Sequence, residues 1–210
     1  MTPDHILNHF RETDALLEGH FILSSGLHSP KYLQCALALQ YPSDAAAFGR
    51  AIAEKFSSLP VLRGVTVTSA GGVVGEPPPL KIDTIASPAI GGLVIGFAVA
   101  QALNARFIWT ERQEGVMTLR RGFSIKGGER ILVVEDVITT GGSTRECIDA
   151  LEKHGAKVVS AASIIDRSNG EADVGVTRIA LVSLDVVTYP PEECPICESG
   201  SVAYKPGSRK

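Results

Sequence analysis

Short runs of valine, isoleucine and leucine alternate along this chain with segments whose apolar residues recur at helical spacing. The runs that predict strands cover residues 83–87, 106–110, 130–135, 157–165 and 177–187, and the helical patterns cover 43–56, 92–103 and 143–153. A strand that is apolar at nearly every position is typically buried on both faces. Alternation of such strands with helices predicts an α/β fold, in which a mostly parallel central sheet is flanked by helices. Ligands of such sheets bind beyond the carboxyl ends of the strands.

The segments outside this alternation predict an N-terminal cap and one irregular stretch. Apolar residues at helical spacing predict a helix over residues 4–17, and residues 20–23 look extended before a turn at 24–26. Residues 65–67 suggest a short strand. Residues 69–80 are rich in glycine and proline, which break both helix and strand, so we expect an irregular loop there.

The composition indicates one globular domain. With 210 residues, of which 44% are hydrophobic, the chain is long enough for one full core and too short for two. We expect a single domain over residues 1–210, with an N-terminal cap or hood subdomain over 1–40 and a C-terminal extension over 190–210. A net charge of −3 argues against nucleic acid and anionic membranes as partners. The longest apolar run, 90–103, is shorter than the roughly 20 residues that span a bilayer. The start of the chain, with an acid and a histidine, lacks the pattern of a secretory leader, so we expect a cytoplasmic protein.

The four cysteines fall into two groups. Cys35 and Cys147 lie in apolar segments and are expected to be small buried hydrophobes rather than halves of disulfides. Cys194 and Cys197 have the spacing of a metal-binding pair, but they supply half of a four-ligand zinc site. A tight turn with reduced thiols is the interpretation that this pair alone favours.

The segment 131–144 contains the clearest chemical signal. A buried strand ends in Glu135 and Asp136, and a turn rich in glycine and hydroxyl groups then opens a helix. Backbone amides of residues 140–143 can hold a phosphate, because the first amides of a helix have no intrahelical acceptor and carry the positive end of the helix dipole. Adjacent carboxylates cannot face that phosphate without repulsion. Ribose hydroxyls and a hard cation such as Mg²⁺ are their natural partners.

Residues 133–143 resemble the motif with which type I phosphoribosyltransferases bind phosphoribosyl pyrophosphate (PRPP). The resemblance implies that family's fold and makes Glu135 and Asp136 the catalytic acids, with Mg²⁺ bound through PRPP nearby. The PRPP-binding residues that it implies in this motif are Glu135, Asp136, Val137, Ile138, Thr139, Thr140, Gly141, Gly142 and Ser143.

Four further segments, 25–30, 87–92, 166–168 and 205–209, are similar to loops of the orotate phosphoribosyltransferase family. The resemblance implies that Ser25, Gly26, Thr139 and Arg167 bind orotate and that Ala89 and Gly91 belong to a loop that binds pyrophosphate. Arg167 has a physical reason for its role. Its planar guanidinium matches the carboxylate of orotate, a group that uracil and the purines lack.

Residues 111–128 resemble the mobile hood loop of the same family. This stretch contains Arg112, Arg120 and Arg121 among glycines, and closing it would bring cations to the pyrophosphate and exclude water. The resemblance implies a homodimer in which the hood serves the neighbouring site, with Arg120 or Arg121 catalytic and Arg112 bound to PRPP. Many family members have lysines and a histidine where residues 113–117 stand here. The sequence therefore leaves open which cation acts.

The resemblance implies transfer of ribose 5-phosphate from PRPP to orotate, giving orotidine 5′-phosphate and pyrophosphate in UMP biosynthesis. The alternatives are a phosphoribosyltransferase for another nucleobase and a PRPP-binding regulator. A DNA-binding regulator is disfavoured because the chain shows neither a helix-turn-helix segment nor a basic stripe. The glycine fingerprint of a dinucleotide-binding domain is also absent after the first strand.

Overall fold

A computed structural model describes residues 1–23, 25–59 and 81–206. The strand suggested at 65–67, the irregular loop expected at 69–80, and the end of the C-terminal extension lie outside these residues.

The sheet predicted from the apolar runs is present, and it has six strands in the order β5-β4-β3-β6-β7-β8. Every neighbouring pair is parallel except β4 and β5, which form an antiparallel edge. The strands are β3 (Thr84–Pro88), β4 (Arg106–Gln113), β5 (Val116–Leu119), β6 (Arg130–Ile138), β7 (Lys157–Asp166) and β8 (Arg178–Ser183). The α/β fold class and the mostly parallel sheet are thereby confirmed.

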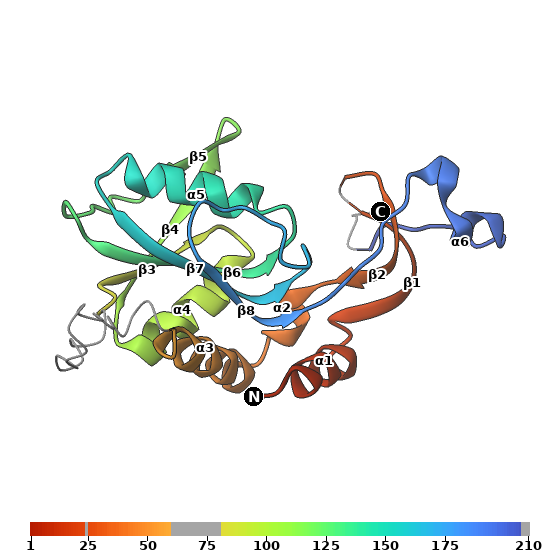
Figure 1. The fold of residues 1–210 in the computed structure, drawn as a ribbon, viewed down its shortest axis with the longest axis horizontal. Coiled ribbons are helices and arrows are strands. Elements are labelled where there is room, and N and C mark those ends of the chain that lie inside the picture. The colour runs from red at the N-terminus through yellow and green to blue at the C-terminus, as the bar shows by residue number, and fades with distance from the viewer. Residues whose placement is uncertain (24, 60–80, 207–210) are drawn as a thin grey trace, which may run out of the picture.

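Helices cover both faces of this sheet (Figure 1). Helices α3 (Pro42–Ser57) and α4 (Gly92–Leu103) lie on one face, and α5 (Gly142–Glu152) lies on the other. Each face has its own cluster of buried apolar side chains, one including Phe48 and the other including Met117. The predicted helices at 43–56, 92–103 and 143–153 are confirmed to within a residue at each end.

The N-terminal segment differs from the long helix expected over 4–17. Helix α1 spans Pro3–Glu12, and Leu16 and Leu17 instead begin strand β1 (Leu16–Ile22). Asp14 adopts a positive φ of 55°, a conformation that no helix continues through. Leu16 pairs with Leu33 of strand β2 (His28–Leu33) and is buried in the core cluster, so tertiary packing overrides the helical spacing of these leucines.

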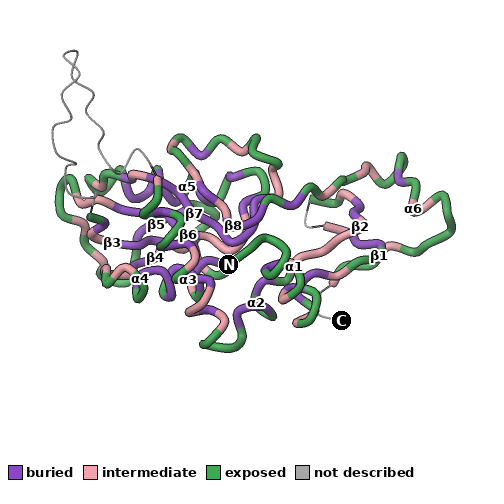
Figure 2. The backbone as a smooth tube through the Cα atoms, turned by 60° about the horizontal axis from the view of Figure 1, so that its bottom comes forward, coloured by how far each residue is buried: buried purple, intermediate pink, exposed green. Residues whose placement is uncertain are grey.

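Strands β1 and β2 form a separate two-stranded sheet, which together with residues 185–206 makes up what we call the hairpin lobe. The C-terminal segment runs beside both strands, with bridges from Tyr204 to Phe21 and from Tyr189 to His28. This segment includes a 3₁₀ turn at Pro191–Glu193 and the short helix α6 (Pro195–Glu198), and α2 (Cys35–Ala38) leads from the lobe to the sheet domain. Buried residues are concentrated in the sheet domain, whereas most residues of the lobe are exposed or half-buried (Figure 2).

The stretch expected to be a polar loop from residue 111 onward is a β-hairpin in its first half. Strand β4 continues to Gln113, and β5 returns beside it after a turn in which Glu114 and Gly115 both have positive φ. Met117 and Leu119 are buried and pack against Ile108 on the α5 face. Every second residue of β5 faces the core, so this part of the hood loop is packed on the sheet.

No helix in the described parts of the chain is long and apolar enough to cross a membrane.

Phe48 provides a test of the packing between the N-terminal helix and α3. Its ring is 1% exposed and meets Phe10 edge-to-face, with ring centroids 5.9 Å apart. We expect Phe48→Ala to lower the free energy of unfolding by about 3–5 kcal/mol, because it removes a buried ring and leaves a cavity. Phe97→Ala is the matched control, since Phe97 is 61% exposed on the neighbouring helix. Urea denaturation measures both, and equal losses would contradict this assignment of the core.

Candidate active site

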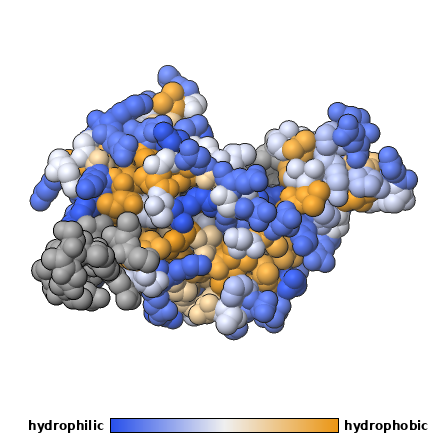
Figure 3. Space-filling model, viewed as in Figure 1, coloured by the Kyte–Doolittle hydropathy of each residue, from blue (hydrophilic) through white to orange (hydrophobic). Residues whose placement is uncertain are grey.

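A cavity of about 620 Å³ lies between the carboxyl ends of the strands and the hairpin lobe. The outline of the molecule narrows between these two parts (Figure 3). The walls include residues from five of the segments that the sequence singled out: Ser25, Gly91, Asp136, Val137, Thr139, Thr140, Arg167 and Lys205. Because β3, β6 and β7 run parallel, the loops that follow them meet at this one edge.

The two adjacent acids of β6 face different surroundings. Asp136 lines the cavity, whereas the carboxylate of Glu135 accepts a hydrogen bond from the hydroxyl of Thr144 on α5. Successive side chains of a strand point to opposite faces, so neighbouring acids cannot both face the cavity while the strand continues. Burial raises the pKa of Glu135 to about 7, with the Thr144 hydrogen bond lowering it and the charge of Asp136 raising it.

Asp136 is held between its own strand and the start of α4. One carboxylate oxygen accepts a hydrogen bond from the amide of Val137 at 2.8 Å. A Cβ atom added at Gly91 would lie 2.9 Å from that oxygen, so glycine is required there for the carboxylate to keep its position. Burial raises the pKa of Asp136, and hydrogen bonds from backbone amides lower it.

The turn after β6 is shaped as an anion site. Gly141 caps α5 with a φ of 81°, and a Cβ atom there would lie 2.8 Å from a methyl group of Val174. Thr140, Gly142 and Ser143 are exposed around this cap, at the amino end of an 11-residue helix. The first backbone amides of such a helix have no intrahelical acceptor and attract an anion.

Arg167 is a cation without a counterion in the described part of the chain. Its backbone amide donates to the carbonyl of Ile138 at 2.8 Å, which ties this loop to the end of β6. Its side-chain Nε is buried and has no hydrogen-bond partner among the described residues, and burial lowers the pKa of the guanidinium. The preceding acid, Asp166, is paired with Arg178 at 2.6 Å. A partly buried charge without a partner is costly, which favours binding of an anion from outside the chain.

Other residues predicted for the site do not line the cavity. Arg121 and Arg120 lie 2.7 and 3.8 Å from Glu111, and Arg112 lies 2.5 Å from Glu146 on α5. The amide of Ala89 donates to the carbonyl of Thr110 at 2.8 Å. The remaining predicted residues outside the cavity wall are Gly26, Glu135, Ile138, Gly141, Gly142 and Ser143.

Several residues that the structure brings to the cavity were not predicted from the sequence. Cys35 lines the wall from α2, and burial raises the pKa of its thiol. Tyr32 of β2 lies in the same wall. Neither stands in a recognisable motif, because each reaches the cavity through the path of the hairpin lobe. Lys205, in contrast, belongs to the C-terminal segment whose resemblance was noted above.

Comparison with known proteins identifies close relatives over the whole chain. Residues 72–187 match the model of the phosphoribosyl transferase domain family. The chain is 48% identical over 210 residues to orotate phosphoribosyltransferase from Pelotomaculum thermopropionicum, with all of both chains covered. It is 45% identical over 201 residues to orotate phosphoribosyltransferase from Thermotoga maritima, covering 94% of this chain and 95% of the relative.

Solved structures share the fold at lower sequence identity. Orotate phosphoribosyltransferase from Aeropyrum pernix superposes with a TM-score of 0.64 at 21% identity, covering 85% of this chain and 93% of the other. Adenine phosphoribosyltransferase from Thermoanaerobacter pseudethanolicus gives a TM-score of 0.53 at 16% identity, covering 73% and 88%. These likenesses establish the fold.

The raised pKa of Glu135 predicts a pH-dependent cost to folding. The carboxyl is neutral in both states below the unfolded pKa of 4.5. The cost grows as the pH rises from there, because the unfolded state loses its proton first, and it is complete above the folded value of about 7. We therefore expect the stability of Glu135→Gln relative to the original chain to increase as the pH rises from 5 to 8, by up to about 3 kcal/mol. Urea unfolding at both pH values measures the difference. Glu152→Gln is the control, because Glu152 is exposed at the end of α5, and it should show no such trend. A constant difference for Glu135→Gln would contradict the assignment.

Proposed function

The chain belongs to the orotate phosphoribosyltransferase family, and we propose that its cavity carries out that family's reaction. The reaction transfers ribose 5-phosphate from PRPP to orotate, giving orotidine 5′-phosphate and pyrophosphate for UMP synthesis. The observation that carries the substrate assignment is Arg167, a half-buried cation in the cavity wall whose Nε is buried and unpaired among the described residues. Among the described residues it has no carboxylate partner, so its guanidinium can bind the carboxylate of an anionic base.

Recognition of orotate rests on charge and shape at this end of the cavity. The planar guanidinium of Arg167 can donate two parallel hydrogen bonds to a carboxylate, and neither uracil nor a purine carries that group. The hydroxyl groups of Ser25 and Thr139 line the same cavity and can bond to the ring. Gly26 follows Ser25 with a φ of 85°, which shapes the loop that presents this hydroxyl.

We assign the phosphate of PRPP to the turn between β6 and α5. The exposed backbone around Thr140, Gly142 and Ser143 lies at the amino end of α5, and Thr139 and Thr140 also line the cavity. Val137 and Ile138 lead into this turn as the last residues of β6. A phosphate at this position leaves the rest of PRPP directed toward Asp136 and the start of α4.

Asp136, with Glu135 behind it, fits the ribose hydroxyls and Mg²⁺. Mg²⁺ prefers oxygen ligands such as carboxylates. Burial raises the pKa of both acids, and a cation or hydroxyl donors nearby would favour their charged forms. Asp136 faces the cavity and would hold these groups, while Glu135 supports it from the α5 side. When bound, Mg²⁺ neutralises charge on the departing pyrophosphate.

The remaining work of the chain is positioning and exclusion of water. A ring nitrogen of orotate displaces pyrophosphate from C1 of the ribose, so no covalent nucleophile from the protein is required. Asp136 stands beside the sugar, where positive charge develops in the transition state, and can stabilise it. Holding both substrates in one cavity makes the displacement effectively unimolecular. We place this reaction in the cytoplasm, where thiols stay reduced, in keeping with the four free cysteines.

We further propose a homodimer in which the hood loop of one chain, residues 111–128, serves the site of its partner. Arg112, Arg120 and Arg121 do not line the cavity of their own chain, and each is paired with a glutamate instead. The three arginines are exposed, so these pairs are weak and can be exchanged for pyrophosphate. Ala89 and Gly91, at the start of α4, are the residues of the same chain that we assign to the pyrophosphate.

Arg167→Ala tests the substrate assignment. We expect the KM for orotate to rise about 10- to 150-fold, since a charge-assisted pair contributes roughly 1.5–3 kcal/mol, while the KM for PRPP changes little. Initial rates are measured spectrophotometrically with PRPP, Mg²⁺ and orotate, uracil or hypoxanthine in turn. Arg50→Ala, an exposed change on α3, is the matched control. Equal losses for both substrates would reject the role of Arg167, and turnover of uracil or hypoxanthine but not orotate would overturn the proposed reaction.

The hood assignment is tested by mixing two inactive chains. Arg120→Ala/Arg121→Ala should lower kcat more than PRPP affinity, because these cations act when the hood closes. Asp136→Asn should be nearly inactive for a different reason, since it removes the charge that we assign to the ribose hydroxyls and Mg²⁺. A mixed dimer contains one site with Asp136 and an intact hood from its partner, so mixing should restore about a quarter of the original activity.

Subunit exchange must be verified independently, by mass spectrometry of differently tagged chains. Mixing two preparations of the Asp136→Asn chain is the control and should restore nothing. If mixed dimers form without activity, the hood does not serve the partner's site.

A further inference from the structure

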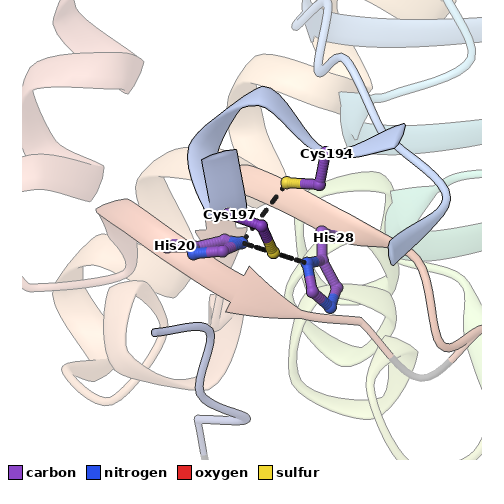
Figure 4. Close-up of side chains that lie close together, drawn as sticks. All are labelled: His20, His28, Cys194 and Cys197. Carbon is purple, nitrogen blue, oxygen red and sulfur yellow. Dashed lines mark hydrogen bonds between the residues drawn. The ribbon is translucent and has the colours of Figure 1, made fainter. Parts of the chain in front are cut away.

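Four side chains from the two ends of the sequence converge inside the hairpin lobe (Figure 4). His20 comes from β1, His28 begins β2, and Cys194 and Cys197 flank the start of α6. One nitrogen or sulfur atom from each lies within 4.8 Å of the corresponding atoms of the other three. His20, His28 and Cys194 are 4%, 9% and 1% exposed, so the group is enclosed rather than gathered by chance on the surface.

The four contact distances within this cluster are close to those of ligands around one ion. His20 Nε2 lies 3.0 Å from His28 Nδ1 and 3.4 Å from Cys194 Sγ. Cys197 Sγ lies 3.3 Å from His28 Nδ1 and 3.7 Å from His20 Nε2. Nitrogen and sulfur ligands at about 2.0–2.3 Å from a tetrahedral zinc ion are separated by about 3.3–3.8 Å.

Hydrogen bonds alone do not account for this arrangement. His20 Nε2 has three polar neighbours, His28, Cys194 and Cys197, but an imidazole nitrogen has one lone pair or one proton and makes one good hydrogen bond. Convergence of four such atoms on a common centre is what a shared cation requires.

The outer contacts of His20 also suit a metal ligand. Its other ring nitrogen, Nδ1, lies 3.1 Å from the backbone carbonyl of Ser201, to which it can donate. That bond leaves Nε2 without a proton and pointed at the cluster. Histidines that bind metals almost always donate their second nitrogen to a carbonyl or carboxylate in this way.

Leu16 at the base of the lobe belongs to the core of the sheet domain, but few apolar side chains hold the rest of the lobe together. Among the described residues between 17 and 34, Phe21 is the buried apolar side chain, and between 185 and 206 Cys194 is the buried one. Neither belongs to the two apolar clusters of the sheet domain. Small units with so little core commonly depend on a metal or on disulfides.

We propose that His20, His28, Cys194 and Cys197 bind one Zn²⁺ as a closed structural site. Two imidazoles and two thiolates in tetrahedral positions select zinc, whereas Mg²⁺ and Ca²⁺ require oxygen ligands. All four positions are taken by the protein, so the ion has no open position for a substrate and is separate from the Mg²⁺ expected at the cavity. The ion fastens the C-terminal segment to both strands of the hairpin.

This link bears on the cavity by position alone. Leu23, Ser25 and Leu27 lie between the two histidines in the sequence, and all three line the cavity, as does Lys205 beyond the cysteines. Zinc would hold these two segments beside each other at the orotate end. This consequence rests on the proposed function, whereas metal binding itself does not.

The test measures metal in the full-length chain, independently of activity. Chain produced with zinc supplied, then dialysed, should contain about one Zn²⁺ by plasma mass spectrometry. Cobalt exchanged into the chain should give the visible bands of tetrahedral Co²⁺ and a sulfur-to-cobalt charge-transfer band. Cys194→Ser/Cys197→Ser should hold less than about a tenth of the original zinc. Cys147→Ala and His154→Gln, which change the same residue types outside the cluster, should keep zinc and the cobalt spectrum.

Two further measurements keep the result decisive if the double variant does not fold. A thiol reagent added to the original chain should release zinc to a colorimetric chelator in step with modification of Cys194 and Cys197. Cys197→His, which replaces one ligand by another, should retain cobalt with a weakened charge-transfer band. Zinc well below one per chain, a Cys194–Cys197 disulfide in the reduced-purified protein, or zinc retained by a folded double variant would each overturn the proposal. Loss of orotate turnover with zinc still bound would count against the proposed function and leave the metal site standing.

Discussion

Parallel pairing of β6 with β3 on one side and β7 on the other is the constraint on which the site depends. Residues 131–134 are fully buried between two layers of helices, so β6 cannot shift without losing its hydrogen bonds and its packing. The strand becomes polar at Glu135, where it reaches the edge of the sheet. The loops that follow the parallel strands β3, β6 and β7 therefore begin at the same edge of the sheet, and the predicted site residues are concentrated there.

Charge at this edge is divided between residues that are paired and residues that are not. Asp166 is held by Arg178 and by the amide and hydroxyl of Ser168, which fixes the loop after β7. Arg167, one residue later, is left without a counterion among the described residues. Leaving a half-buried cation unpaired costs stability, and a bound carboxylate would offset that cost. Under the proposed function, selectivity for an anionic base would follow from a loop that the neighbouring ion pair holds in place.

The molecule uses two different means of holding its parts together. The sheet domain is stabilised by apolar side chains on both faces of the sheet. The hairpin lobe has Phe21, the ring contacts that Phe21 makes with Tyr32 and Tyr204, and the cluster of histidines and cysteines. Such a lobe can contribute a wall to the cavity while being only lightly packed, because polar and metal-ligating contacts fix its geometry at few points.

Local sequence determined the elements whose causes are local. Continuous apolar runs specified the buried strands, and helical spacing specified α3, α4 and α5. The acids, glycines and hydroxyls after β6 predicted an anion site, since these residues are contiguous. Arg167 could be predicted as an orotate-binding residue because the three-residue segment 166–168 resembles a loop of the family and its guanidinium matches a carboxylate. The tertiary structure decided what depends on the path of the chain. It placed Asp136 in the cavity and turned Glu135 toward Thr144, formed a hairpin from residues expected to be a loop, and completed the pair Cys194 and Cys197 with His20 and His28. The two histidines lie more than 160 residues before the cysteines. No local pattern encodes such a pairing, because it arises only when the C-terminal segment folds back along β1 and β2.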